Sequence, residues 1–145
     1  MIRRASLADL ETLVPLFEAY RQFYRKPPDP ERARQFLKER IESNESVIFL
    51  AFDQTTATGF AQLYPVFSSA ALARTLILND LFVASEARRA GIGAALLNAS
   101  IDYGRSIGAY RLTLSTELTN TAARAAYEKN GWTRDTAFCV YHRLL

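Results

Sequence analysis

The sequence contains few of the residues that build disulfide frameworks and metal centres. Its 145 residues include one cysteine, Cys139, and one histidine, His142. A single thiol excludes an internal disulfide and a thiolate metal site, and a single imidazole excludes a histidine-rich cluster, so we expect no metal. Cys139 lies in an apolar stretch near the C-terminus, where we expect a strand and a small buried side chain.

Long hydrophobic runs are also missing. The longest uninterrupted one, residues 47–52, is far too short to cross a bilayer, and the chain becomes charged at Arg3 without an apolar signal region. We therefore expect a soluble, cytoplasmic protein with no membrane partner. The hydrophobic content of 49% can build a sizeable core, and the length suits one domain over residues 1–145.

The net charge of +3 is small, and no basic tract concentrates it. Seven arginines and lysines lie between residues 21 and 40, but five acidic residues between positions 18 and 42 are interleaved with them. Such a mixture is typical of solvated helix faces. It argues against a nucleic acid partner.

Hydrophobic periodicity and turn residues predict a mixed α/β (α+β) fold. Ser6 and Asp9 resemble a capping signal for a first helix, and Asp29 followed by Pro30 is typical of the start of a second. The expected order is strand, two helices, three strands, helix, strand, helix and two strands. The corresponding residues are 2–4, 6–24, 30–43, 47–52, 59–67, 75–83, 91–105, 110–116, 120–130 and, for the last two strands, 132–145.

The segment from Arg88 to Ala94 carries the strongest functional signal, because it follows an apolar strand and opens a long amphipathic helix. The first N–H groups of a helix have no intrahelical partner, and Gly91 and Gly93 let an anion approach them closely. Arg88 and Arg89 add positive charge. We therefore expect this loop to bind a diphosphate.

Two other glycine-rich phosphate loops do not fit this segment. A Walker loop requires Gly-Lys-Ser/Thr after the cradle, but Gly93 is followed by Ala94 and Ala95. A dinucleotide fold requires a small residue where Leu96 stands, and an acidic residue at the end of the next strand, where residues 110–114 have none.

The loop and a second motif downstream resemble the GNAT acyltransferases. The loop fits the family signature R/Q-x-x-G-x-G/A as Arg88, Gly91 and Gly93, and it follows the strand at residues 78–83. The second motif is an asparagine, a tyrosine seven residues later and a glycine-aromatic pair: Asn120, Tyr127, Gly131 and Trp132. The resemblance covers essentially the whole chain.

This resemblance implies the GNAT acyl-CoA N-acyltransferase fold, whose central mixed sheet splays after Val83 and is flanked by helices, and acetyl-coenzyme A as the donor. It implies that pantetheine pairs with the splayed strand, that Asn120 hydrogen-bonds the pantetheine arm, and that the Tyr127 hydroxyl protonates the departing thiolate. Helical spacing would place Asn120 and Tyr127 on one face. The implied cofactor-binding residues are Leu81, Phe82, Val83, Arg88, Arg89, Ala90, Gly91, Ile92, Gly93, Ala94, Asn120 and Tyr127.

Acetyl transfer to an amine needs a base, because an alkylammonium with a pKa of about 10.4 has no free lone pair. In the similar spermidine/spermine acetyltransferases a glutamate is the proposed base, but the matching residue here is Asn79, which cannot remove a proton. Asp80 is our candidate catalytic residue and Glu117 another. Strand alternation would turn Asp80 to the opposite face unless a bulge re-aims it, and a structural role for it is equally open.

The first two helices usually cover the acceptor side of this fold. Tyr20, Phe23 and Tyr24 follow helical spacing and form one aromatic stripe, which is either core packing or a wall around an amine. We take Tyr20, Tyr24 and Asn79 as candidate substrate-binding residues. Segments 17–24 and 36–40 are similar to the small histone and polyamine acetyltransferases, which implies a basic amine acceptor and is compatible with a homodimer.

The sequence thus predicts an N-acetyltransferase that transfers acetyl directly to a primary amine, such as a polyamine, a lysine side chain or another small amine. A direct mechanism fits the lack of an activated nucleophile. Three alternatives stay open. They are a different acceptor, such as an aminoglycoside, an amino acid or a protein N-terminus; a catalytically silent coenzyme A-binding regulatory domain, suggested by Asn79; and an interaction domain that keeps only the fold.

Overall fold

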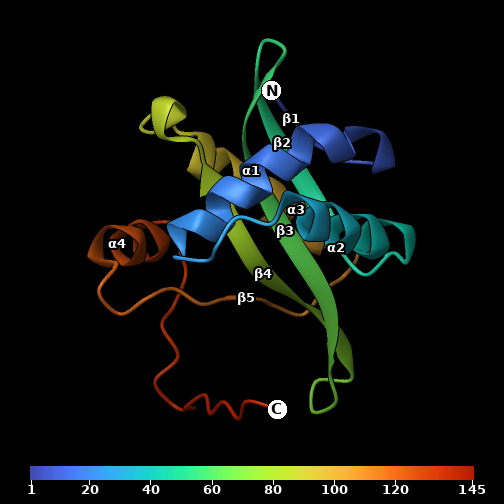
Figure 1. The fold of residues 1–145 in the computed structure, drawn as a ribbon. Coiled ribbons are helices and arrows are strands. Elements are labelled where there is room, and N and C mark those ends of the chain that lie inside the picture. The colour runs from blue at the N-terminus through green and yellow to red at the C-terminus, as the bar shows by residue number, and fades with distance from the viewer. The chain divides into compact units, whose positions relative to one another are not determined.

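A computed structural model describes residues 1–145 as two compact units, Met1–Leu114 and Ser115–Leu145 (Figure 1). The second unit contains one helix, α4 (Thr121–Lys129). No helix of the chain has the length and apolar character needed to cross a membrane. The elements of the first unit are β1 (Ile2–Arg4), α1 (Leu10–Phe23), α2 (Pro30–Glu42), β2 (Val47–Asp53), β3 (Thr56–Ser68), β4 (Ala73–Val83), α3 (Ile92–Ser106) and β5 (Leu112–Leu114), with short 3-10 turns at Leu7–Asp9 and Ser85–Ala87.

The strands of the first unit form one mixed sheet in the order β1-β2-β3-β4-β5. Neighbouring strands are antiparallel except β4 and β5, which are parallel. β5 pairs only with Leu76–Leu78, whereas β4 continues to Val83 beside β3. The mixed, splayed sheet is therefore confirmed, but β4 and β5 part after Leu78 and not after Val83, because β5 is only three residues long.

Helices cover both faces of this sheet. On one face α1 and α2 pack over a core that includes Leu13, Leu37, Leu50 and Phe60. On the other face α3 packs against β2, β3 and β4 (Figure 1). Both faces are therefore apolar, and a polar side chain on either of them requires hydrogen-bond partners.

The helix starts expected from the sequence are confirmed. The Asp9 carboxylate accepts hydrogen bonds from the Ser6 N–H at 2.8 Å and the Ser6 hydroxyl at 3.2 Å, and a 3-10 turn leads into α1. The Asp29 side chain accepts from the Arg32 N–H at 3.2 Å at the start of α2, whose first residue is Pro30.

The second unit consists of α4 and the segments beside it. The helix ends in a Schellman motif: the Trp132 N–H donates to the Tyr127 carbonyl and the Gly131 N–H to the Glu128 carbonyl, both at 3.1 Å. Gly131 has a φ of +85°, which the motif requires and which favours glycine. The expected role of Gly131 as the helix-terminating residue is confirmed.

The prediction of two closing strands within residues 132–145 is wrong. The Asp135 carboxylate accepts hydrogen bonds from the N–H groups of Ala137 at 2.8 Å and Phe138 at 3.2 Å, and this local turn replaces a strand ladder. Cys139, expected to be buried in one of these strands, is exposed for the same reason. The apolar composition of residues 137–141 is therefore not sufficient to form a strand.

Asp9 should give the fold an acid-sensitive contribution to stability. Hydrogen bonds from the Arg3 guanidinium and the Ser6 backbone lower the pKa of Asp9 to about 2. Because the folded-state pKa lies below the usual value, this contribution is complete above about pH 4 and is lost as the pH falls through about 2. We expect Asp9→Asn to lower the free energy of unfolding by on the order of 1 kcal/mol at about pH 7 and much less at about pH 2.5.

Urea unfolding at both pH values checks this expectation, with Glu31→Gln as a control in an exposed carboxylate. An equal loss of stability at the two pH values would show that the carboxylate charge is not what Asp9 contributes.

Candidate functional site

Two consecutive residues of β4, Asn79 and Asp80, lie on the same face of the sheet. Leu78 pairs with Leu63 of β3 and Asp80 pairs with the adjacent Gln62, so Asn79 is the extra residue of a β-bulge. The bulge resets the strand alternation, and Asp80 lies on the α1 side of the sheet instead of on the α3 side. A bulge thus gives Asp80 the orientation that simple strand alternation would not give it.

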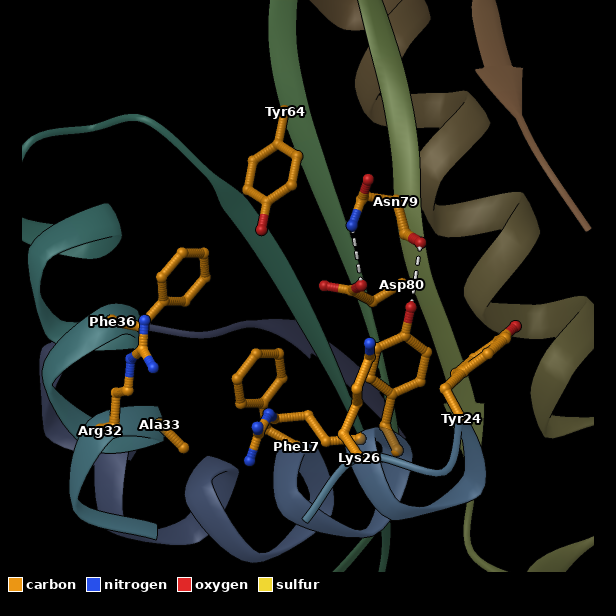
Figure 2. Close-up of a pocket in the computed structure, with 11 residues that line it drawn as sticks. Phe17, Tyr24, Lys26, Arg32, Ala33, Phe36, Tyr64, Asn79 and Asp80 are labelled. Carbon is orange, nitrogen blue, oxygen red and sulfur yellow. Dashed lines mark hydrogen bonds between the residues drawn. The ribbon is translucent and has the colours of Figure 1, made fainter. Parts of the chain in front are cut away.

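The Asp80 carboxylate is buried, with only 2% of the residue exposed. It accepts hydrogen bonds from the Gln62 amide at 2.5 Å and from the Asn79 amide at 2.9 Å (Figure 2 shows the second). Burial raises the pKa of Asp80, although the hydrogen bonds from Gln62 and Asn79 and the nearby Tyr20 hydroxyl oppose the shift. A carboxylate with a raised pKa is a better proton acceptor than an ordinary one.

Asp80 and Asn79 line a cavity of about 570 Å³ beneath α1 and α2 (Figure 2). Its walls are mainly aromatic, and the rings of Tyr20 and Tyr24 meet edge to face with their centroids 5.0 Å apart. The cavity is large enough for a small-molecule substrate. Its aromatic lining residues are Phe17, Tyr20, Tyr24, Phe36 and Tyr64.

The members of the aromatic stripe lie in different surroundings. Tyr20 and Tyr24 line the cavity, and the Tyr20 ring also packs against the core residue Phe60 at 5.8 Å. The Tyr20 hydroxyl donates to the Asn79 carbonyl at 3.4 Å. Phe23 is 53% exposed and lies beneath the Arg88 guanidinium, 5.8 Å from its ring centroid.

The loop after β4 has the backbone of an anion cradle. Arg89 and Gly91 have left-handed φ values of +71° and +74°, and Gly91 precedes the first turn of α3 without a side chain that could cap it. A Cβ on Gly91 would meet nothing within 4 Å, and one on Gly93 would meet only Val83, at 3.9 Å. Packing within the protein therefore does not demand glycine at position 93, whereas close approach of a ligand would.

Arg88 connects this loop to β4. Its Nε donates to the Val83 carbonyl at 3.1 Å, at the end of the strand segment Leu81–Val83 that runs past β5. Arg89 is exposed. The two arginines therefore differ: Arg88 fixes the loop, and Arg89 presents its charge to solvent.

Asn120, Tyr127 and Glu117 belong to the second unit. The Asn120 side-chain oxygen accepts a hydrogen bond from the Ala123 N–H at 3.2 Å, and its backbone is not helical, because it is the residue that caps α4. Asn120 therefore lies just outside α4, whose helical residues are Thr121–Lys129, and helical spacing does not apply to it as the sequence analysis assumed. The Tyr127 ring lies 6.2 Å from that of Trp132.

Sequence reasoning did not single out Gln62, Tyr64, Lys26 or Arg32, all of which reach Asp80 or its cavity. Gln62 could have been found, because it is a polar residue between Phe60 and Tyr64 on the same face of an otherwise apolar strand. No group of three or more histidine, cysteine, aspartate or glutamate side chains is placed to hold a metal ion.

Comparison with known proteins bears on the family and the fold of the chain. The model of the acetyltransferase (GNAT) family matches residues 13–132. An uncharacterized N-acetyltransferase of Bacillus subtilis, YhfO, is 49% identical over 140 residues, which cover 97% of this chain and 94% of that protein. A probable acetyltransferase of Haemophilus influenzae is 43% identical over 101 residues, or 69% of each protein.

A solved structure shows the same fold. The crystal structure of a probable acetyltransferase superimposes with a TM-score of 0.94 at 41% identity, and the match covers 100% of this chain and 97% of that one. The chain is therefore an acetyltransferase of the GNAT family, whose enzymes generally use acetyl-coenzyme A.

Proposed function

We propose that this chain is an N-acetyltransferase that moves the acetyl group of acetyl-coenzyme A directly to a primary amine held in the cavity beside Asp80. The observation that carries the proposal is the bulge at Asn79, which directs a buried carboxylate into an aromatic cavity next to the splay of β4 and β5. Both units act as one domain in this proposal, which the family match across residues 13–132 supports.

The proposed cofactor site consists of the β4 end and the loop that follows it. The backbone of Leu81–Val83 pairs with pantetheine, since β5 no longer accompanies β4 there. The first N–H groups of α3 and the charge of Arg89 bind the diphosphate along residues 88–94. Asn120 offers its amide N–H groups to the pantetheine arm, because its oxygen already caps α4.

The bound thioester supplies the acetyl group and a thiolate leaving group. Asp80 accepts a proton from the substrate ammonium, directly or through a water molecule, and the freed lone pair attacks the thioester carbonyl. Tyr127 would donate its hydroxyl proton to the thiolate as the carbon–sulfur bond breaks, and the second nitrogen proton of the adduct would pass to the Tyr127 phenolate or to water, leaving the neutral amide. Gln62 and Asn79 hold the Asp80 carboxylate in place, and Tyr20 donates to the carbonyl of the bulge residue.

Calorimetric titration with acetyl-coenzyme A, followed by a thiol-release assay with a panel of amines, tests the proposal as a whole. Binding together with thiol release on one amine class supports the enzyme. Binding without release on any amine favours the regulatory-domain alternative, for which the replacement of the expected glutamate by Asn79 is the supporting observation.

Replacing the proposed base should change how activity depends on pH. The deprotonated carboxylate is the active form, so wild-type activity should fall as the pH drops through the raised pKa of Asp80. We expect Asp80→Asn to lower kcat/KM by roughly a hundredfold or more and to remove this acidic limb. The nearby Tyr20 and Tyr64 hydroxyls do not produce the limb, because burial raises their pKa values and they remain protonated.

The same substitution should not weaken the fold at neutral pH. A carboxyl whose folded-state pKa is raised destabilises the protein once the pH exceeds its unfolded value, and Asn removes that charge. Thermal unfolding of Asp80→Asn and of the exposed control Asp102→Asn separates lost chemistry from lost structure. An unaltered pH profile in an inactive, folded Asp80→Asn variant would remove Asp80 from the role of base.

Tyr127→Phe keeps the ring beside Trp132 and removes only the proposed acid. We expect kcat to fall by roughly tenfold to a hundredfold, while the affinity for acetyl-coenzyme A stays within about twofold of wild type. Steady-state kinetics and calorimetry measure both quantities, with Tyr141→Phe as a control in the same unit. A parallel loss of turnover and of cofactor affinity would mean that Tyr127 is structural.

Gly93→Val should obstruct the diphosphate, because a β-branched side chain would project into the cradle at the first turn of α3. We expect the Kd for acetyl-coenzyme A to rise by about tenfold or more. Ala95→Val, at an exposed position two residues further along α3, is the matched control. Unchanged affinity in a folded Gly93→Val variant would show that the diphosphate binds elsewhere.

A further inference from the structure

We propose that the acceptor amine also carries an anionic group, a carboxylate or a phosphate, which Lys26 and Arg32 bind while the amine reaches Asp80. This inference rests on the proposed function and specifies its acceptor. Its basis is the distribution of charge around the cavity, to which Lys26 contributes from the segment between α1 and α2, and Arg32 from α2 (Figure 2).

Three cations and one carboxylate line the cavity. Arg21 is already neutralised, because its guanidinium lies 2.6 Å from the buried Glu18 carboxylate and also donates to the Pro27 carbonyl. Lys26 and Arg32 have no acidic partner. The carboxylate of Asp29 accepts only the backbone N–H of Arg32, at 3.2 Å, and does not pair with its guanidinium.

Some cations of the first unit pair with carboxylates: Arg3 with Asp9, Arg34 with Glu11 and Glu31, and Arg40 with Glu45. Others, such as the exposed Lys38 of α2, have no ion pair, so it is their place in the cavity lining that distinguishes Lys26 and Arg32. The two cations that face the cavity are thus left for a ligand, and a carboxylate or phosphate is the group that fits them.

Asp80 is the one carboxylate that lines the cavity. It accepts two hydrogen bonds from amides and is buried at the bulge, whereas Lys26 and Arg32 are exposed. A cavity lined by both a buried carboxylate and exposed cations suits a molecule that carries both an ammonium and an anion. The rings of Phe17 and Phe36 in the same lining stack with their centroids 6.0 Å apart and suit a hydrocarbon spacer.

A polyamine fits this distribution poorly. Once one ammonium reaches Asp80, a second one would meet Lys26 or Arg32, and like charges in a partly desolvated cavity repel. The charge pattern of this cavity therefore disfavours the polyamine acceptor that the family resemblance implied.

Amines of matched length test the proposal. Thiol release is measured with 5-aminopentanoate, with its phosphonate analogue, with pentylamine and with 1,5-diaminopentane. Shorter and longer members of each series are measured in the same way. These compounds share the reacting amine and differ in the charge of the far end. We expect kcat/KM for the anionic members to exceed that of the neutral amine by about tenfold, with the diamine lowest.

A double variant that lacks both charges tests whether Lys26 and Arg32 cause the preference for anionic amines. Lys26→Gln with Arg32→Gln should raise KM for the anionic amine by about tenfold and leave KM for pentylamine and for acetyl-coenzyme A unchanged. Lys38→Gln, an exposed lysine on α2 outside the cavity, is the matched control. A preference that survives in the double variant, or a diamine that is the best substrate, overturns the proposal.

A rise in KM for acetyl-coenzyme A in the double variant would also overturn it, because Lys26 and Arg32 would then bind the cofactor. Calorimetry of the same amines against the coenzyme A-loaded protein separates this inference from the proposed function. If no amine releases thiol, the proposed function fails, but preferential binding of the anionic amines, lost in the double variant, still supports the inference. Equal binding of amines with anionic, neutral and cationic far ends contradicts it.

Discussion

A carboxylate that is taken out of water must be hydrogen-bonded, and the first unit of this protein is organised around that requirement. Asp80 receives one amide from the neighbouring strand and one from the residue before it, and α1 adds a tyrosine hydroxyl that binds the carbonyl of the bulge. Each donor comes from a different part of the chain. The carboxylate can stay buried only while β3, β4 and α1 keep their relative positions.

The bulge at Asn79 and the C-terminal end of β4 lie beside different parts of the first unit. The bulge faces the aromatic cavity on the α1 side, and the last residues of the strand lead into the loop that opens α3. Arg88 links these regions, because it donates to the Val83 carbonyl and lies over the ring of Phe23 at the end of α1. The loop that precedes α3 is thus fixed both to the strand and to the helix that covers the cavity.

Local signals in the sequence predicted much of this structure. Features that depend on contacts between residues far apart in the chain could not be predicted from it. The Ser6–Asp9 and Asp29 caps, the loop glycine Gly91 and the terminating Gly131 depend on residues a few positions apart, which can be read directly. The direction of Asp80 depends on the register between two strands, and alternation alone gives the wrong face. Lys26 and Arg32 resemble ordinary solvated cations until their place in the cavity lining is known. The irregular C-terminal segment shows that a short apolar run does not by itself make a strand.

The hairpin of β3 and β4 also has a consequence for the order of folding. Gln62 and Asp80 are 18 residues apart in the chain, on the two arms of a hairpin closed by a turn at Ser69–Leu72, whereas Tyr20 and Asn79 are separated by 59 residues. Closing the shorter loop costs less chain entropy. The register that aims Asp80 can therefore form within the hairpin itself, before α1 docks, so that the helix closes over a carboxylate that is already in position.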